Sequence, residues 1–167
     1  APEAAVDAGI DETRILQFGE GVGGRYSLWS AVGVSMAIAL GWDAFEELLE
    51  GAAEMDRHFR FSEGAANIPL LAAFADRFYV EQVGCQTRGL FAYDERLRLL
   101  PFYLQQLEME SNGKSVTTNG KPAGHTAPVT WGGTGTDAQH AVFQLLHQGT
   151  VTIPVELPVG NLSETIE

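Results

Sequence analysis

The segment QQLEMESNGK, residues 105–114, places the carboxylate of Glu110 at the end of a predicted helix. Gly113 and Lys114 are typical of a helix C-terminus, where the helix dipole leaves partial negative charge. An acid at that end costs about 0.3–1 kcal/mol. Because this cost is small, Glu110 by itself could be an ordinary solvated residue at a helix end. The alternative is a general base, because a partly desolvated carboxylate near the negative end of a helix is expected to have a raised pKa.

The residues by themselves leave open the roles of three other polar side chains, Arg25, Gln106 and His140. Arg25 follows a glycine-rich run, GEGVGG at residues 19–24, whose backbone can approach a ligand while the guanidinium binds anionic oxygens. This loop has neither the sequence of a Walker loop nor the spacing of a dinucleotide fingerprint. Gln106 lies one helical turn before Glu110, on the same face. His140 lies in an otherwise apolar helix. By themselves, Arg25 could serve a structural ion pair and His140 could be a structural histidine.

The remaining histidines and the cysteine show no site of their own. His147 lies seven residues after His140, on the same predicted helix face, so the two could be confused. His58 and His125 belong to no recognisable pattern, and the histidines and Cys85 show no zinc-ligand spacing. The sequence therefore predicts no metal site.

Composition excludes several classes of partner. The net charge of −12 argues against nucleic acid and anionic membranes. The longest apolar run, residues 31–40, is about half of the roughly 20 residues that a membrane helix needs. A secretory signal is also missing, and a single cysteine fits a reducing compartment, so a cytoplasmic protein is expected. The chain starts at Ala1 without a methionine and stops directly after an apolar run, which favours a piece of a longer protein.

Helical and strand patterns alternate along the 167 residues, which is one domain's length. This order predicts a single α/β domain over residues 1–167, with a layered, largely parallel sheet flanked by helices. In such a fold we expect Arg25 and Glu110 to converge near the carboxyl ends of the strands. Asn119-Gly120 predicts a hairpin turn. The expected strands are residues 14–18, 89–93, 128–131 and 150–157, and the expected helices are residues 27–40, 42–59, 68–83, 95–110 and 137–148.

Three blocks carry a resemblance to a known family. GEGVGGRYSLWSAVG, QQLEMESNGK and WGGTGTDAQHAVFQLLHQGT resemble, in order, signature segments of the glucose-6-phosphate isomerase (phosphoglucose isomerase) family. FAYDERLRLLPFYLQQ resembles the segment that leads into the second block. The resemblance extends over residues 7–157, which is about a third of a full-length member. It identifies the chain as a fragment comprising mainly the second sugar-isomerase (SIS-type) domain of the family.

The resemblance implies an activity and roles for particular residues. The family interconverts glucose 6-phosphate and fructose 6-phosphate, a step of glycolysis and gluconeogenesis, through a cis-enediol intermediate with proton transfer between C2 and C1. By resemblance Glu110 is the base, Arg25 the cation beside the enediolate, and His140 the ring-opening group. Gln106 and Gly24 would bind substrate. The family is homodimeric, with the histidine reaching into the neighbouring subunit's site, and no cofactor or metal is implied.

Two departures qualify the resemblance. Family members commonly read Trp-Gly-Glu-Pro-Gly-Thr-Asn-Gly-Gln-His. Here Gly133 and Thr134 replace the acid and the proline, a change that bears on the loop shape and the local charge near His140. The family's phosphate-binding loops and a catalytic lysine fall outside this chain, so the isolated fragment is expected to be inactive. The alternative is a non-catalytic sugar-phosphate-binding sensor module, which would not need the set of Glu110, Arg25 and His140.

Overall fold

The computed structural model describes residues 2–160. The chain divides into two compact units, residues 1–69 and residues 70–167. The single-domain organisation expected for residues 1–167 stays a prediction.

The described part of the first unit contains α-helices, 3-10 turns and irregular segments, and no strand. The predicted helix from residue 42 is confirmed as α3, and the predicted helix over 27–40 is divided into short 3-10 turns followed by α2. The strand predicted at residues 14–18 is wrong. Leu16 and Phe18 are about half exposed and have no neighbouring strand in the described unit, and a strand is not stable without one. The helices are α1 (Pro2–Asp7), α2 (Val34–Leu40) and α3 (Trp42–Phe61), and the 3-10 turns are Glu12–Arg14, Gly24–Trp29, Ala31–Gly33 and Gly64–Ala66.

The small core of this unit centres on Phe45 of α3. Phe45 is buried, and the Trp42 ring meets it edge to face at a centroid distance of 5.9 Å. Gly33 permits a close approach, because a Cβ there would lie 2.8 Å from the Phe45 ring and 2.3 Å from the Leu28 carbonyl oxygen. The 3-10 turn before α2 therefore packs closely against α3 where Gly33 meets the Phe45 ring.

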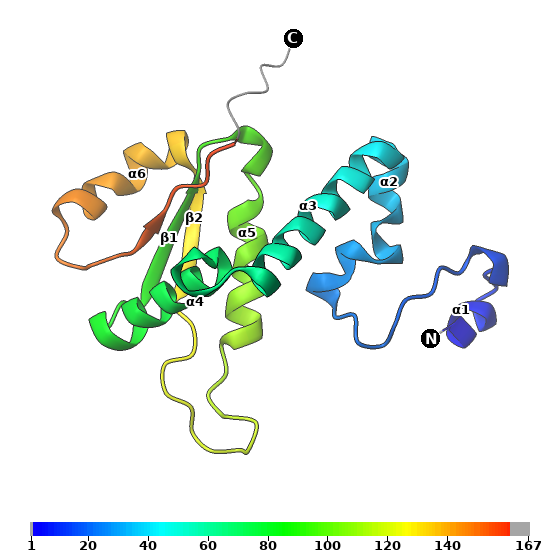
Figure 1. Ribbon diagram of the computed structural model, residues 1–167, viewed down its shortest axis with the longest axis horizontal. Coiled ribbons are helices and arrows are strands. Elements are labelled where there is room, and N and C mark those ends of the chain that lie inside the picture. The colour runs from blue at the N-terminus through cyan, green and yellow to red at the C-terminus, as the bar shows by residue number, and fades with distance from the viewer. Residues whose placement is uncertain (1, 161–167) are drawn as a thin grey trace, which may run out of the picture. The chain divides into compact units, whose positions relative to one another are not determined.

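The second unit contains a three-stranded parallel sheet in the order β2-β1-β3 (Figure 1). The strands are β1 (Thr87–Ala92), β2 (Val129–Thr134) and β3 (Val155–Glu156). β1 pairs with β2 along its whole length, from Thr87 opposite Val129 to Ala92 opposite Thr134. The strands predicted near residues 89 and 128 are confirmed, whereas only two residues of the predicted 150–157 strand pair with β1.

Helices follow these strands in the predicted alternation. Helix α4 starts in the first unit and ends in the second, and both α4 and α5 continue into π-helical turns, which the sequence did not predict. The elements are α4 (Ile68–Phe78) with the π-turn Tyr79–Val83, a 3-10 turn Glu95–Leu97, α5 (Leu100–Gln105) with the π-turn Gln106–Glu110, and α6 (Gly135–Gln148).

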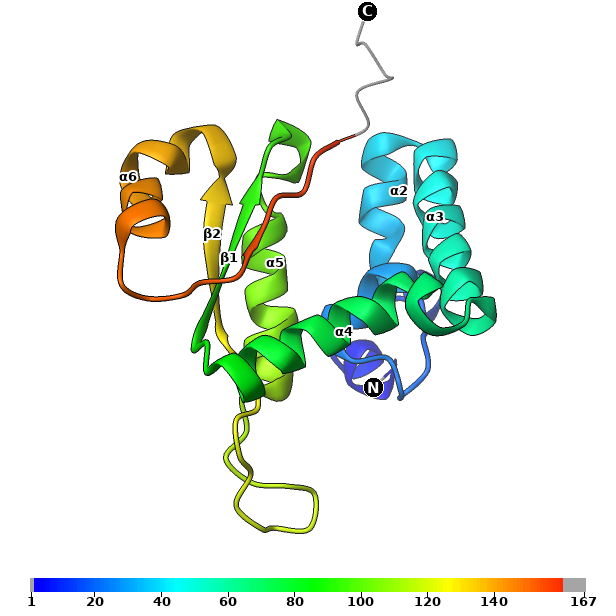
Figure 2. The ribbon, with the colours of Figure 1, turned by 60° about the vertical axis from the view of Figure 1, so that its left-hand side comes forward.

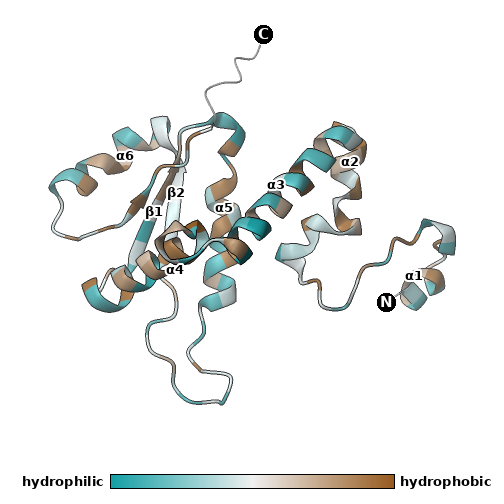
Figure 3. Cartoon of the chain, in the orientation of Figure 1, coloured by the Kyte–Doolittle hydropathy of each residue, from teal (hydrophilic) through white to brown (hydrophobic). Residues whose placement is uncertain are grey.

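The helices cover opposite faces of the sheet, and the alternation of β1 shows which helix covers which face. The Phe91 ring contacts the Phe143 ring of α6 at a centroid distance of 5.6 Å. On the other face, Arg88 is bonded to Asp76 of α4 and to Glu108 of the turn after α5. Figure 2 shows the sheet between α5 and α6. Leu90, Phe91 and Ala92 are at most 1% exposed. Figure 3 shows apolar segments alternating with polar segments along α4, α5 and α6. The predicted α/β class with a parallel sheet flanked by helices is confirmed.

The long connection between α5 and β2, residues 111–128, contains the predicted hairpin turn. Val116 and Pro122 form an antiparallel bridge, and the Gly120 N–H donates to the Thr117 carbonyl at 2.9 Å. Gly120 has a φ of +73°, a conformation that favours glycine. The Asn119-Gly120 prediction is therefore confirmed.

Candidate functional site

The predicted base and its neighbour lie on a π-helical turn. Gln106 and Glu110 are the first and last residues of this turn, and both are exposed in the described unit. Single π-turns are uncommon and are found frequently at functional sites. The turn presents the amide and the carboxylate four residues apart, on one side of the helix.

Gly113 and Lys114, which the sequence indicated as a helix C-terminus, cap the end of this helix. The Gly113 N–H donates to the Met109 carbonyl at 2.8 Å, and a Cβ on Gly113 would lie only 2.3 Å from that oxygen. The Lys114 ammonium donates to the carbonyl of Glu110. A cation on the last carbonyls offsets the negative end of the helix dipole, so Glu110 is not the sole charge at this terminus.

This helix end lies at the amino ends of the strands. Glu108, in the middle of the π-turn, accepts hydrogen bonds from Arg88 and Thr130, the second residues of β1 and β2. The expectation that Glu110 lies near the carboxyl ends of the strands is therefore wrong. The reason is topological, because α5 begins beyond the carboxyl end of β1 and runs back along the sheet.

Arg88 is the centre of a buried ionic cluster. It is 5% exposed, and its guanidinium pairs with Glu108, with Asp76 at 2.7 Å and with Glu156 at 3.3 Å. Burial by itself lowers the pKa of Arg88, but the hydrogen bonds and charges of Glu108 and Asp76 outweigh it and the net shift is upward. Burial raises the pKa of Glu156, and the other two carboxylates add to that effect while Arg88 opposes it. The cluster thus contains three acids around one permanent cation.

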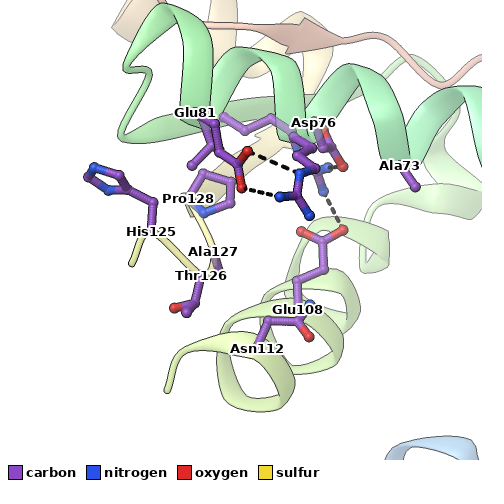
Figure 4. Close-up of a pocket in the computed structure, with 12 residues that line it drawn as sticks. Ala73, Asp76, Glu81, Glu108, Asn112, His125, Thr126, Ala127 and Pro128 are labelled. Atoms are coloured by element: carbon purple, nitrogen blue, oxygen red, sulfur yellow. Dashed lines mark hydrogen bonds and ion pairs between the residues drawn. The ribbon is translucent and has the colours of Figure 1, made fainter. Parts of the chain in front are cut away.

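A cavity of about 420 Å³ adjoins this cluster (Figure 4). Figure 4 shows Asp76 and Glu108 extending toward each other from different helices, with Asn112 on the same helix end as Glu108. Gln106, Glu110 and His140 do not line the cavity. The second unit therefore contains a cavity lined mainly by charged and polar residues, and the cavity does not include these predicted catalytic residues. Its charged and polar lining is Asp76, Arg77, Glu81, Arg88, Glu108, Asn112, His125 and Thr126.

His140 lies on the other face of the sheet from Glu110. It is exposed on α6, which packs against the Phe91 face, whereas Glu110 follows α5 on the Arg88 face. The start of α6 is fixed by Tyr93, whose hydroxyl accepts from Gln139 at 2.6 Å. Gly135 leaves room for the Tyr93 ring, since a Cβ would lie 2.4 Å from it. Glu110 and His140 of the same chain therefore do not lie close together within this unit.

Two other histidines have structural partners. The His147 ring meets the Phe143 ring at a centroid distance of 6.1 Å, which distinguishes it from His140. The His58 Nε2 accepts from the Ile68 N–H at 3.1 Å, and its Nδ1 lies 3.1 Å from the Ser62 hydroxyl. His58 therefore closes the end of α3, a role that no sequence pattern indicated.

Arg25 and Gly24 lie in the first unit, on the 3-10 turn Gly24–Trp29. Gly24 is exposed and Arg25 is half-buried. The Ser27 hydroxyl donates to the Gly24 carbonyl at 2.7 Å, so this serine stabilises the turn that carries both residues. The convergence of Arg25 with Glu110 stays a prediction.

The departures at Gly133 and Thr134 have simple local consequences. A Cβ at Gly133 would meet nothing within 4 Å, so this position has room for the larger acid common in the family. Thr134 has a φ of −69°, the value that proline favours. The backbone at the end of β2 is therefore compatible with the commoner family sequence.

Residues 2–160 contain no group of three or more histidine, cysteine or acidic side chains placed to hold a metal ion. Among these same residues, no helix has both the length and the apolar character that crossing a bilayer requires.

The Arg88 cluster was not predicted from the sequence. One signal was available, because a charged residue within the otherwise apolar strand TRGLFA must be paired when it is buried. Its partners could not be assigned from the sequence, since Asp76, Glu108 and Glu156 come from three separate segments.

Comparisons with known proteins agree on one family. Residues 1–164 match the family model for phosphoglucose isomerase. A glucose-6-phosphate isomerase of Sphingopyxis alaskensis is 74% identical over 96% of this chain and 32% of its own length. That of Zymomonas mobilis is 63% identical over 93% of this chain and 31% of its own length. The chain thus spans about a third of these relatives.

A solved structure supports the same relationship. The chain is similar to a glucose-6-phosphate isomerase from Chlamydia trachomatis, with a TM-score of 0.83 and 35% identity over 93% of this chain and 34% of that one. The resemblance of the three sequence blocks is confirmed. The chain belongs to the phosphoglucose isomerase family.

Proposed function

We propose that this chain is part of a longer isomerase that interconverts glucose 6-phosphate and fructose 6-phosphate through a cis-enediol. Glu110 moves the proton between C2 and C1, and Arg25 stabilises the enediolate oxygens. His140 opens the sugar ring, and Gln106 and Gly24 bind the substrate. Its cellular location is the cytoplasm.

The observation that carries the proposal is the π-turn that presents Gln106 and Glu110 together on an exposed helix end. A carboxylate that moves a proton between adjacent carbons must face substrate, and an amide one turn away can hold the hydroxyls beside those carbons. The high identity to glucose-6-phosphate isomerases over nearly all of this chain supports the same assignment.

The position of His140 supports a dimeric enzyme. Since the sheet separates the helix of His140 from the helix of Glu110, the two side chains act on one sugar only if they come from different chains. A homodimer in which each subunit supplies the histidine of its partner's site meets that requirement. Exposure of His140 in the described unit agrees with such a role.

Replacing Glu110 with Gln in the full-length enzyme tests the proposal. The change keeps the shape of the side chain and removes the base, so turnover should fall by about 10²–10⁴-fold while substrate binding changes little. Exchange of the substrate C2 proton with solvent should be lost. Glu95→Gln is the matched control, because Glu95 is an exposed acid paired with Arg98 and should leave turnover unchanged.

Two results would contradict the assignment. Near-normal turnover and proton exchange in Glu110→Gln would place the base elsewhere. A wild-type enzyme that binds fructose 6-phosphate but exchanges no C1 proton with solvent would be a sugar-phosphate sensor instead.

A further inference from the structure

We propose that Thr130 and Arg88 are positioning residues of the isomerase site, acting through Glu108 to fix the π-turn that presents Gln106 and Glu110. This inference rests on the proposed function of Glu110 as the base. Thr130, Arg88 and Glu108 do not belong to the set of residues that the family resemblance assigned to the reaction.

Both carboxylate oxygens of Glu108 are bonded, each to a different strand. Oε1 accepts from an Arg88 Nη on β1, and Oε2 accepts from the Thr130 hydroxyl on β2 at 2.8 Å. Two anchors on neighbouring strands fix the side chain in direction as well as in distance. The π-turn is therefore held in one rotation relative to the sheet.

The anchors are themselves immobilised. Thr130 is 1% exposed and Arg88 is 5% exposed, so neither side chain has room to move. Arg88 is held from two further elements by Asp76 of α4 and Glu156 of β3. Charge-assisted hydrogen bonds in such buried surroundings are stronger than solvated ones and polarise one another. The cluster is thus a rigid attachment point between the sheet and the turn.

The spacing within the turn connects this attachment to catalysis. Glu108 lies two residues after Gln106 and two before Glu110, and residues two apart on a helix do not share a face. When Glu108 points to the sheet, Gln106 and Glu110 must point away from it, toward the exposed side where both are found. A rotation of the turn would move both of these side chains together.

Loss of one anchor should therefore reduce turnover more than substrate affinity. A misplacement of about 1 Å can cost about 10²-fold in rate, so loosening the turn by a fraction of that should cost about tenfold. Thr130→Val in the full-length enzyme keeps the volume and removes the donor. We expect kcat to fall about tenfold with KM changed less than about threefold, and Thr130→Ser, which keeps the hydroxyl, to restore kcat.

The matched control is Thr87→Val on β1. Thr87 lies in the same sheet, opposite Val129, and its hydroxyl makes no bond to Glu108 in the described part of the chain. This variant should keep wild-type kcat. If Thr130→Val does not give folded enzyme, Glu108→Gln takes its place, since it keeps the shape and weakens both anchors.

A double variant separates positioning from general stability. In the Glu110→Gln background the base is already gone, so adding Thr130→Val should lower the residual rate no further. An equal tenfold loss in both backgrounds, or wild-type kcat in Thr130→Val, would overturn the positioning role. Full activity in Glu110→Gln would overturn the proposed function instead, so the two failures are distinguishable.

Discussion

The two units of this chain differ in how they bury apolar side chains. In the second unit Phe91 is completely buried, with the Trp131 and Phe143 rings against it at centroid distances of 5.5 and 5.6 Å. In the first unit Ile38 and Phe61 are 80% and 81% exposed within the described chain. The second unit has a core built around a central strand, whereas the first unit has helices around a single buried ring.

This difference between the cores determines which unit can fix the position of a functional site. A central parallel strand is covered on both faces, so its residues and the groups bonded to them have fixed positions. The π-turn with Glu110 is attached to such a strand through Glu108. The 3-10 turn that carries Arg25 belongs to a unit with little core. We expect the parts of the proposed full-length enzyme outside this chain to cover the apolar residues of this unit.

The largest expected effect is complete inactivity of the isolated 167-residue chain. The predicted site residues are present, but from the family resemblance we expect the phosphate-binding loops to lie outside this chain. Arg25 is one cation on a chain of net charge −12, so a dianionic sugar phosphate is held weakly. Binding of the remote phosphate also positions the sugar for proton transfer, so its loss lowers turnover as well as affinity.

The purified chain should therefore show no turnover of fructose 6-phosphate above background in a coupled assay. The full-length enzyme at the same concentration is the positive control. Turnover that rises with concentration of the chain, and is lost in Glu110→Gln, would show that the missing segments are not needed.

Much of the fold could be predicted because its signals are local. The apolar run that became β1 and the one-sided helix that became α3 were both identified from their periodicity. The 14–18 run failed because a strand depends on a neighbour, which periodicity does not reveal. The π-turns were not predicted, since the sequence of a π-turn resembles that of the helix it extends.

The sequence indicated which residues could form the site, but it did not indicate how they are arranged in space. The block containing Gln106 and Glu110 indicated their proximity, because spacing along one helix determines it. The end of the sheet where Glu110 lies depends on the direction of α5, and the anchors of Glu108 come from two strands. Contacts between distant segments have no local signal, so this part required the structure.

Removal of one large apolar ring from each unit is expected to give the next largest difference, which is a difference in unfolding free energy. Phe91→Ala removes a completely buried ring and should cost about 3–5 kcal/mol of unfolding free energy. Phe61→Ala is the matched change in the first unit and should stay within about 0.5 kcal/mol in the isolated chain, because that ring is already exposed. Urea denaturation followed by circular dichroism measures both.

The same two variants in the full-length enzyme test whether the rest of the protein covers the first unit. If the rest of the protein covers the first unit, Phe61→Ala should become more destabilising there than in the isolated chain. An unchanged small effect of Phe61→Ala would mean that this ring stays exposed in the longer protein, and our account of the first unit would be wrong.

The smallest expected effect concerns one capping acid in each unit. Asp94 in the second unit accepts hydrogen bonds from the Arg96 side chain and backbone N–H, which together with the arginine's charge lower its pKa from 3.8. Asp11 in the first unit has its pKa lowered by the Thr13 hydroxyl and backbone N–H. Because the folded state binds the proton less tightly than the unfolded state, each acid contributes stability that is full above pH 3.8 and is lost as the pH falls through the folded pKa.

Asp94→Asn and Asp11→Asn should therefore each lower stability slightly at pH 6, with a difference from wild type that shrinks as the pH falls below 3.8. Native-state amide exchange at Leu90 and at Phe45 reports the two units separately. If the units open independently, Asp94→Asn should speed exchange at Leu90 alone and Asp11→Asn at Phe45 alone. Equal acceleration at both amides by either variant would show that the two units unfold as one, despite the difference between their cores.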